Sequence, residues 1–111
     1  MRSGGGRISL SLQEHQELQT IGGAIEIEFT GDPGSLIVVR KDAGSAVAVS
    51  SKCTHLGCTV RKEPSFFRCP CHGSTYTLEG EVVRGPAEFP LDRYDAKIEG
   101  DEIIITLKIV N

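Results

Sequence analysis

Hydrophobic and polar residues alternate with a period of two along much of the chain. The alternating apolar positions are Ile8, Leu10 and Leu12, and then Ile25, Ile27 and Phe29. This period places apolar side chains on one face of an extended strand, whereas a helix would repeat them every 3.6 residues. Residues 36–39 and 46–49 are short apolar runs that we also predict to be strands. Sustained helical periodicity is absent from the sequence, and residues 12–18 offer at most a single helical turn.

Turn-forming sequences separate these segments and complete an all-β pattern. Predicted turns lie at residues 32–34, 42–44, 79–81 and 99–102. Further strands are predicted over residues 66–68, 75–78 and 103–110, with a short one around Lys97 and Ile98. The last two strands should pair as a hairpin. The predicted fold is a small antiparallel β-sandwich of stacked sheets.

Length and composition agree with one compact domain. The chain has 111 residues, few aromatic residues and no tryptophan, so its core must consist mainly of isoleucine, valine and leucine. A domain of this size gains stability from a cross-link or a metal centre. The net charge of −3 gives no signal for a polyanionic partner, and we expect no nucleic acid to bind.

All four cysteines lie in two short segments. The first is CTHLGC at residues 53–58, and the second is CPCHGS at residues 69–74. Each offers one thiolate and one imidazole, with a second cysteine left over. This donor set fits a two-iron cluster with mixed ligands together with one disulfide. We predict that both segments are loops at one end of the sandwich, where a redox centre can approach its partner.

Mixed ligation changes the redox chemistry of a [2Fe-2S] cluster. Four thiolates leave an oxidised cluster with a charge of about −2, whereas two thiolates and two neutral imidazoles leave it near zero. Adding an electron to the neutral centre costs less electrostatic work, so potentials rise to roughly −150 to +300 mV from roughly −400 mV. Histidine also titrates near neutral pH, so reduction can be coupled to proton uptake.

These two motifs resemble those of the Rieske iron–sulfur family, specifically its high-potential branch in cytochrome bc-type complexes. The resemblance covers about residues 18–108. It implies that the cluster ligands are Cys53, His55, Cys69 and His72, with the cysteines on the inner iron and the histidines on the outer one. It also implies a disulfide between Cys58 and Cys71. Rieske ferredoxins and oxygenase domains usually lack this extra cysteine pair, which favours the respiratory branch.

Residues around the ligands refine the resemblance. Ser74 and Tyr76 match positions where the family places hydroxyl donors to cluster sulfur atoms, and such hydrogen bonds favour the reduced form. The same resemblance places Leu56, Gly85 and Pro86 around the cluster. Residues 84–87 look like the family's proline loop, although Glu88 replaces its second proline.

The resemblance implies a one-electron carrier with no substrate turnover of its own. In the respiratory family, the second-loop histidine accepts a hydrogen bond from quinol and takes an electron and a proton. The domain then moves to a c-type cytochrome. His72 would fill this role, with His55 as its exposed partner. The implied partners are therefore a quinol-oxidising cytochrome b-type subunit and a c-type cytochrome.

Other interpretations of the same residues remain open. The small subunit of an arsenite-oxidase-type enzyme would carry the same disulfide-bearing cluster, and a ring-hydroxylating oxygenase would use a low-potential Rieske ferredoxin. Four cysteines and two histidines could also bind zinc or form two plain disulfides. These last two interpretations leave several of the matched residues without a role. His15 lies in a polar run, and we expect it to be a solvated surface residue.

A lasting disulfide indicates the periplasm or the outer face of an energy-transducing membrane rather than a reducing cytosol. No apolar stretch reaches the roughly 20 residues of a membrane span, and residues 1–7 do not form a secretory signal. We interpret residues 1–7 as a flexible tail or hinge remnant and residues 8–111 as the cluster-binding domain. On this interpretation, an N-terminal anchor preceded the glycine run in a longer natural protein; the alternative is a soluble protein in which these glycines are a cloning remnant.

Overall fold

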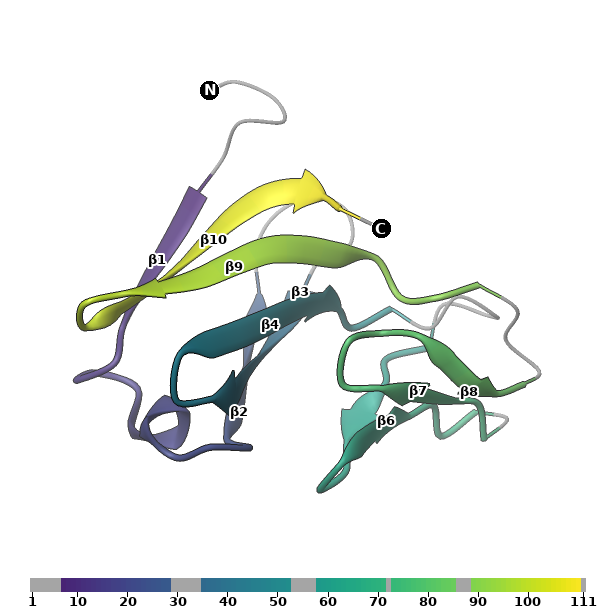
Figure 1. Cartoon of the computed structure of the whole chain (residues 1–111). Helices are drawn as coiled ribbons and strands as arrows, with labels where there is room; N and C mark the ends of the chain where they lie inside the picture. The colour runs from purple at the N-terminus through teal and green to yellow at the C-terminus, as the bar shows by residue number, and fades with distance from the viewer. Residues whose placement is uncertain (1–6, 29–34, 53–57, 72, 86–88, 111) are drawn as a thin grey trace.

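Two antiparallel sheets make up the fold (Figure 1). The computed structural model describes residues 7–28, 35–52, 58–71, 73–85 and 89–110. The larger sheet has six strands in the order β1-β10-β9-β4-β3-β2, and the smaller has four in the order β5-β6-β7-β8. The larger sheet contains β1 (Arg7–Ser11), β2 (Ala24–Glu28), β3 (Ser35–Asp42), β4 (Ser45–Ser50), β9 (Arg93–Glu99) and β10 (Glu102–Ile109). The smaller sheet contains β5 (Arg61–Lys62), β6 (Phe66–Arg68), β7 (Thr75–Thr77) and β8 (Val82–Arg84).

Strands β3 and β4 are central because both of their faces are buried. Alternate side chains point to opposite faces of a strand. Ile37, Val39, Val47 and Val49 therefore enter a core shared with the smaller sheet. Leu36, Val38, Ala46 and Ala48 enter a second core with Ile103 and Ile105 of β10. The two apolar runs in the sequence are thus strands buried on both sides.

The predicted C-terminal hairpin is present, with β9 and β10 paired from Glu99 opposite Glu102. Gly100 in the turn has φ +60°, a left-handed conformation that glycine adopts without steric cost. Strand β9 is longer than the predicted short strand, because Tyr94, Ala96 and Ile98 pack on the second core while polar residues alternate with them. Strand β1 pairs with β10, so the first described residues join the end of the chain.

The predicted helical turn is present but shifted toward the C-terminus. A 3-10 helix, η1 (Gln16–Gln19), buries Leu18 in the second core. Its start is fixed by the Leu18 amide, which donates to the His15 carbonyl at 2.9 Å. His15 is half-buried rather than fully solvated, because it lies where the chain enters this turn.

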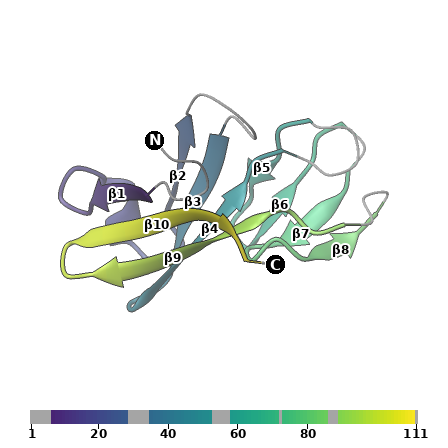
Figure 2. The ribbon, with the colours of Figure 1, turned by 90° about the horizontal axis from the view of Figure 1, so that it is seen from above.

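The smaller sheet lies at one end of the molecule and packs against β3 and β4 (Figures 1 and 2). The predicted strands over residues 66–68 and 75–78 correspond to β6 and β7, and the turn at residues 79–81 follows them. Strands β5 (two residues) and β8 (three residues) were not predicted, whereas the equally short β6 and β7 were predicted because they flank the second cysteine motif. Phe29 and the predicted turn at residues 32–34 lie outside the described residues.

Candidate metal centre

A disulfide joins Cys58 to Cys71, the pairing that the resemblance implied. Cys58 lies just before β5, and Cys71 lies in the segment between β6 and β7. Their Cα atoms are 6.5 Å apart, within the range that a disulfide spans. The bond therefore connects the two cysteine-containing segments at the edge of the smaller sheet.

Cys69 directly follows β6 and is 2% exposed. Its amide donates to the Ser74 carbonyl at 2.8 Å, and the Gly73 amide donates to the Cys69 carbonyl at 2.9 Å. Gly73 has φ +82°, which makes this tight turn accessible to glycine. The turn holds Cys69 against Phe67 and Tyr76 in the shared core. Sequence reasoning assigned no role to Gly73, although its place in the second motif was a signal for such a turn.

The sulfur atoms of Cys58, Cys69 and Cys71 lie within 4.8 Å of one another. The Cys69 sulfur thus lies beside the disulfide. Cys69 belongs to a turn in which both its amide and its carbonyl form backbone hydrogen bonds. Thiolate sulfur is a soft donor, and soft donors suit iron–sulfur clusters and zinc. The buried setting of Cys69 excludes competing water, which fits a cluster ligand.

Ser74 and Tyr76 are completely buried beside this turn. Tyr76 lies on β7 opposite Phe67 of β6, so its position is fixed by the sheet register. Gly85 follows β8 and is exposed. The remaining predicted site residues, Cys53, His55, Leu56, His72 and Pro86, lie outside the described residues.

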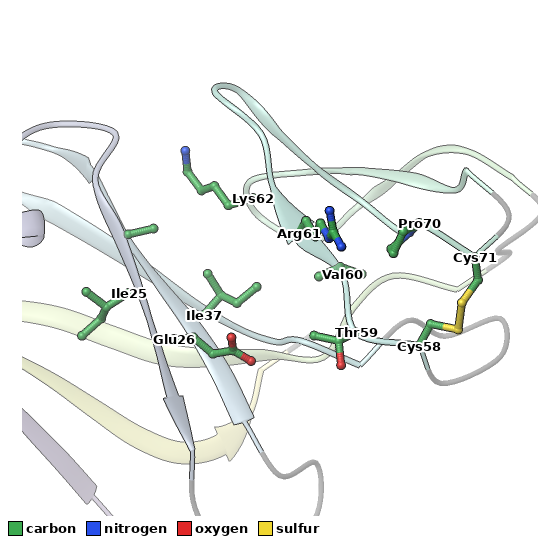
Figure 3. A pocket seen from close by; sticks show the side chains of 11 residues that line it. Ile25, Glu26, Ile37, Cys58, Thr59, Val60, Arg61, Lys62, Pro70 and Cys71 are labelled. Carbon is green, nitrogen blue, oxygen red and sulfur yellow. A yellow bond between two sulfur atoms is a disulfide. The ribbon is translucent and has the colours of Figure 1, made fainter.

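An open groove of about 710 Å³ reaches the disulfide from the side of the larger sheet (Figure 3). One wall is formed by edge strand β2 together with Ile37, and the other by residues 58–62 of the smaller sheet. Cys58, Pro70 and Cys71 close one end of the groove. Cys69, Ser74 and Tyr76 do not line the groove.

The cofactor of this region follows from the family to which the chain belongs. The model of the Rieske [2Fe-2S] domain matches residues 10–95. The chain belongs to the Rieske [2Fe-2S] domain family. Its cofactor is a [2Fe-2S] cluster, and the buried thiol of Cys69 is a suitable donor for it.

Individual relatives of this Rieske domain point to the high-potential branch. The cytochrome b6-f complex iron-sulfur subunit of Chlorobaculum thiosulfatiphilum is 45% identical over 96 residues, covering 78% of this chain and 52% of that protein. The chain thus spans about half the length of the curated relatives that it matches.

Solved structures share the fold of this Rieske domain. The cyanobacterial plasma membrane Rieske protein from Synechocystis PCC 6803 has a TM-score of 0.70 at 31% identity, over 82% of this chain and 92% of that one. The ferredoxin of carbazole 1,9a-dioxygenase from Nocardioides aromaticivorans has a TM-score of 0.69 at 25% identity, over 96% of this chain and 100% of that one. Both the respiratory and the ferredoxin interpretations are therefore compatible with the fold alone.

Within the part of the chain that the structure describes, no helix has the length and apolar character needed to cross a membrane.

Proposed function

We propose that this Rieske domain transfers single electrons from a quinol to a c-type cytochrome, as the iron–sulfur subunit of a bc-type complex. The observation that carries the proposal is the Cys58–Cys71 disulfide beside the buried Cys69. This bond separates the high-potential branch from ferredoxins, which usually lack the cysteine pair. The similarity to a cytochrome b6-f iron-sulfur subunit supports the same assignment.

In this proposal, Cys53 and Cys69 supply the thiolate ligands, and His55 and His72 supply the imidazole ligands. When bound, the cluster supplies a one-electron acceptor and donor. The His72 ring accepts a hydrogen bond from the quinol hydroxyl and then holds the proton that accompanies the electron. Ligation by two thiolates and two imidazoles keeps the charge near zero, which raises the potential into the range needed to oxidise a quinol.

Ser74 and Tyr76 are proposed to donate hydrogen bonds to cluster and cysteine sulfur atoms. Both side chains are fully buried, so bulk water does not compete for their hydroxyl groups. Donors of this kind favour the reduced form because negative charge on sulfur strengthens the bond. The two hydroxyls would therefore raise the midpoint potential.

The proposed location is the outer, positive face of an energy-transducing membrane. A structural disulfide persists in an oxidising compartment and is rare in a reducing cytosol. From this side, the proton held by His72 would be released to the positive side when the electron passes to the cytochrome.

A redox titration of the cluster-loaded chain tests the proposal. Iron and acid-labile sulfide should be present in equal amounts, and electron paramagnetic resonance should detect nitrogen coordination. The midpoint potential should be positive at pH 7 and should fall by about 59 mV per pH unit once a ligand histidine titrates, as one proton accompanies one electron. Ser74→Ala and Tyr76→Phe should each lower this potential without loss of the cluster.

The same titration separates the alternative functions. A midpoint near −150 mV without pH dependence around neutrality would establish a ferredoxin and overturn the quinol assignment. A colourless protein that contains zinc and no inorganic sulfide would overturn the redox assignment altogether. An arsenite-oxidase-type subunit would share the high potential, so reduction by a quinol analogue in the presence of the cytochrome b partner distinguishes it.

A further inference from the structure

Three sulfur atoms with different surroundings meet where the groove ends. The sulfurs of Cys58, Cys69 and Cys71 are all within 4.8 Å of one another, and two of them already form a disulfide. Cys69 is buried, Cys58 is half-buried and Cys71 is exposed. Thiolates exchange with disulfides by direct attack of one sulfur on another, so a third sulfur this close to a disulfide is placed for reaction.

We propose that these three cysteines form a thiol–disulfide exchange site in the chain before it receives its cluster. The Cys69 thiolate attacks the sulfur of Cys58 and forms a Cys58–Cys69 bond. The Cys58–Cys71 bond breaks, and Cys71 leaves as a thiolate that takes a proton from water. One disulfide and one thiol are present before and after the step, so it requires no oxidant or reductant.

The exchange requires a local movement that shortens the distance from the Cys69 sulfur to the Cys58 sulfur and brings the three sulfurs into line, because the attacking sulfur displaces the leaving one along the S–S axis. A disulfide bond is about 2.05 Å long, so closing the gap from 4.8 Å requires the sulfurs to approach by at most about 2.8 Å. Cys58 and Cys69 are eleven positions apart, against thirteen for the existing pair. The two loops that the alternative bonds close are therefore similar in length, and loop entropy scarcely favours either pairing.

The structure also selects which sulfur leaves. Cys71 is exposed and lines the end of the groove beside Cys58 and Pro70, so water can solvate a departing thiolate (Figure 3). Attack on Cys71 instead would join Cys69 to Cys71 across Pro70 alone, and the fixed φ of proline restricts so small a ring. Exchange at Cys58 is therefore the favoured route.

This exchange has a consequence that rests on the proposed ligand role of Cys69. A chain with the Cys58–Cys69 bond has lost one thiolate ligand and cannot bind the cluster in the proposed way. Conversely, iron bound to the Cys69 sulfur removes the attacking group and preserves the Cys58–Cys71 pairing. Cluster insertion and correct disulfide pairing are thus coupled, because a chain that loses its cluster exchanges between the two pairings and only the Cys58–Cys71 form can bind the cluster again.

Disulfide mapping of the 111-residue chain tests the exchange directly. The cluster-loaded chain is compared with chain from which a chelator has removed iron anaerobically. Both are quenched at intervals in acid with N-ethylmaleimide, which labels thiols in the denatured state. Trypsin cuts after Arg61, Arg68 and Arg84, so Cys69 and Cys71 share one peptide, and fragmentation between Cys69 and Pro70 locates the label.

The label should appear on Cys71 in a growing fraction of the iron-free chain, reaching tens of per cent, and in almost none of the cluster-loaded chain. A Cys53→Ser chain provides the sharpest version, because its single thiol reports the pairing without side reactions of Cys53. The matched control is the double variant Cys53→Ser with Cys69→Ser, in which Cys71 should never be labelled. Label confined to Cys69 after prolonged incubation at pH 8 would overturn the proposal.

Repeating the Cys53→Ser experiment in concentrated urea compares exchange in the folded chain with exchange through random encounters of the sulfurs in the unfolded chain. Exchange should be faster in the native chain than in the unfolded chain, because folding brings the three sulfurs together. An equal or slower native rate would overturn the proposal. None of these measurements uses the redox potential. The disulfide mapping can therefore be interpreted even if the redox titration contradicts the proposed function. Absence of exchange would likewise leave the conclusion from the redox titration unaffected.

Discussion

The two sheets of this Rieske domain are stabilised in different ways. Strands of the larger sheet have five to eight residues, and they bury a core of their own between β10, β9 and the outer face of β3 and β4. Strands of the smaller sheet have two or three residues, and their buried side chains depend on β3 and β4 for a partner surface. The larger sheet thus has one core that does not involve the smaller sheet, whereas the smaller sheet has only the shared core and the disulfide.

This division suits the proposed electron transfer. A redox centre needs ligands held at fixed positions close to its partner, and loops on a rigid scaffold provide this. The cost is that the smaller sheet cannot stabilise itself, since isolated short strands are marginal in water. The difference between the sheets therefore predicts that a destabilising substitution in the smaller sheet unfolds that sheet first, while the larger sheet remains folded.

Removing Phe67 should give the largest effect. Phe67 is completely buried in the core shared by the two sheets. Phe67→Ala should cost about 3–5 kcal/mol through lost burial and the resulting cavity. Hydrogen exchange should show loss of amide protection in β6 and β7, while the amides of Ile103 and Ile105 in β10 stay protected.

The control for this variant is Val83→Ala, since Val83 lies in the same sheet but is 63% exposed. Its stability should change by less than about 0.5 kcal/mol. A uniform loss of amide protection across both sheets in Phe67→Ala would show that the two sheets fold as one cooperative unit. It would refute the view that they are stabilised in different ways.

Removal of the disulfide should rank second. Cys58 and Cys71 close a loop with a sequence separation of 13, for which loop entropy predicts a loss of about 3 kcal/mol. The double variant Cys58→Ser with Cys71→Ser should unfold at lower denaturant concentration and release its cluster more readily. Urea titration of the iron-free chain isolates the protein contribution. Unchanged stability there would show that the bond only positions ligands.

Much of the larger sheet could be predicted because its signals are local. The apolar runs of β3 and β4 and the turn before Glu102 are readable from neighbouring residues alone. The start of β9 at Arg93 could not be predicted from its neighbours. Polar residues alternate along β9, and the burial of Tyr94 and Ala96 depends on strands far away in the sequence.

The candidate site was predictable for a different reason. Cys58, Cys69 and Cys71 belong to two compact motifs whose spacing identifies the family, so the disulfide pairing followed from the resemblance. The contacts that hold the two sheets together could not be predicted in this way. The approach of Gly80 to Leu91 and the pairing of Lys41 with Glu79 arise only when the smaller sheet docks.

Gly80→Ala should have the third-largest effect. Gly80 is buried with φ +92°, and an added Cβ would lie 3.1 Å from the Leu91 carbonyl oxygen and 3.3 Å from the Leu91 Cβ. The left-handed conformation alone should cost about 1–2 kcal/mol for alanine. Close contact with the Leu91 backbone should add to this cost.

Gly100→Ala is the matched control in the larger sheet. Gly100 also has positive φ, at +60°, but an added Cβ would meet nothing within 4 Å. Urea unfolding should therefore show a greater loss for Gly80→Ala than for Gly100→Ala, and the difference measures the docking contact. Equal losses of stability would mean that the Leu91 backbone moves away from the added Cβ at no measurable free-energy cost.

The smallest effect should come from the ion pair between Lys41 on β3 and Glu79 in the turn after β7. The hydrogen bond from Lys41 and its positive charge lower the pKa of the Glu79 carboxyl below the ordinary 4.5. A lowered pKa in the folded state means that this stabilisation is present above pH 4.5 and is lost as the pH falls through the folded-state pKa. Because both side chains are more than one-third exposed, it should amount to only about 0.2–1 kcal/mol.

Glu79→Gln should therefore reduce stability at pH 7, and the difference from the parent chain should shrink as the pH falls below 4.5 and through the folded-state pKa of Glu79. Glu99→Gln is the control, because the Lys97–Glu99 pair, at 3.0 Å, lies within β9 and connects no sheets. Hydrogen exchange at pH 7 should show that Glu79→Gln loosens β7 more than Glu99→Gln loosens β9. A surface pair that joins the two sheets restrains their docking, whereas a pair within one strand restrains only its own side chains. Equal and small effects on both strands would mean that the shared apolar core alone holds the two sheets together.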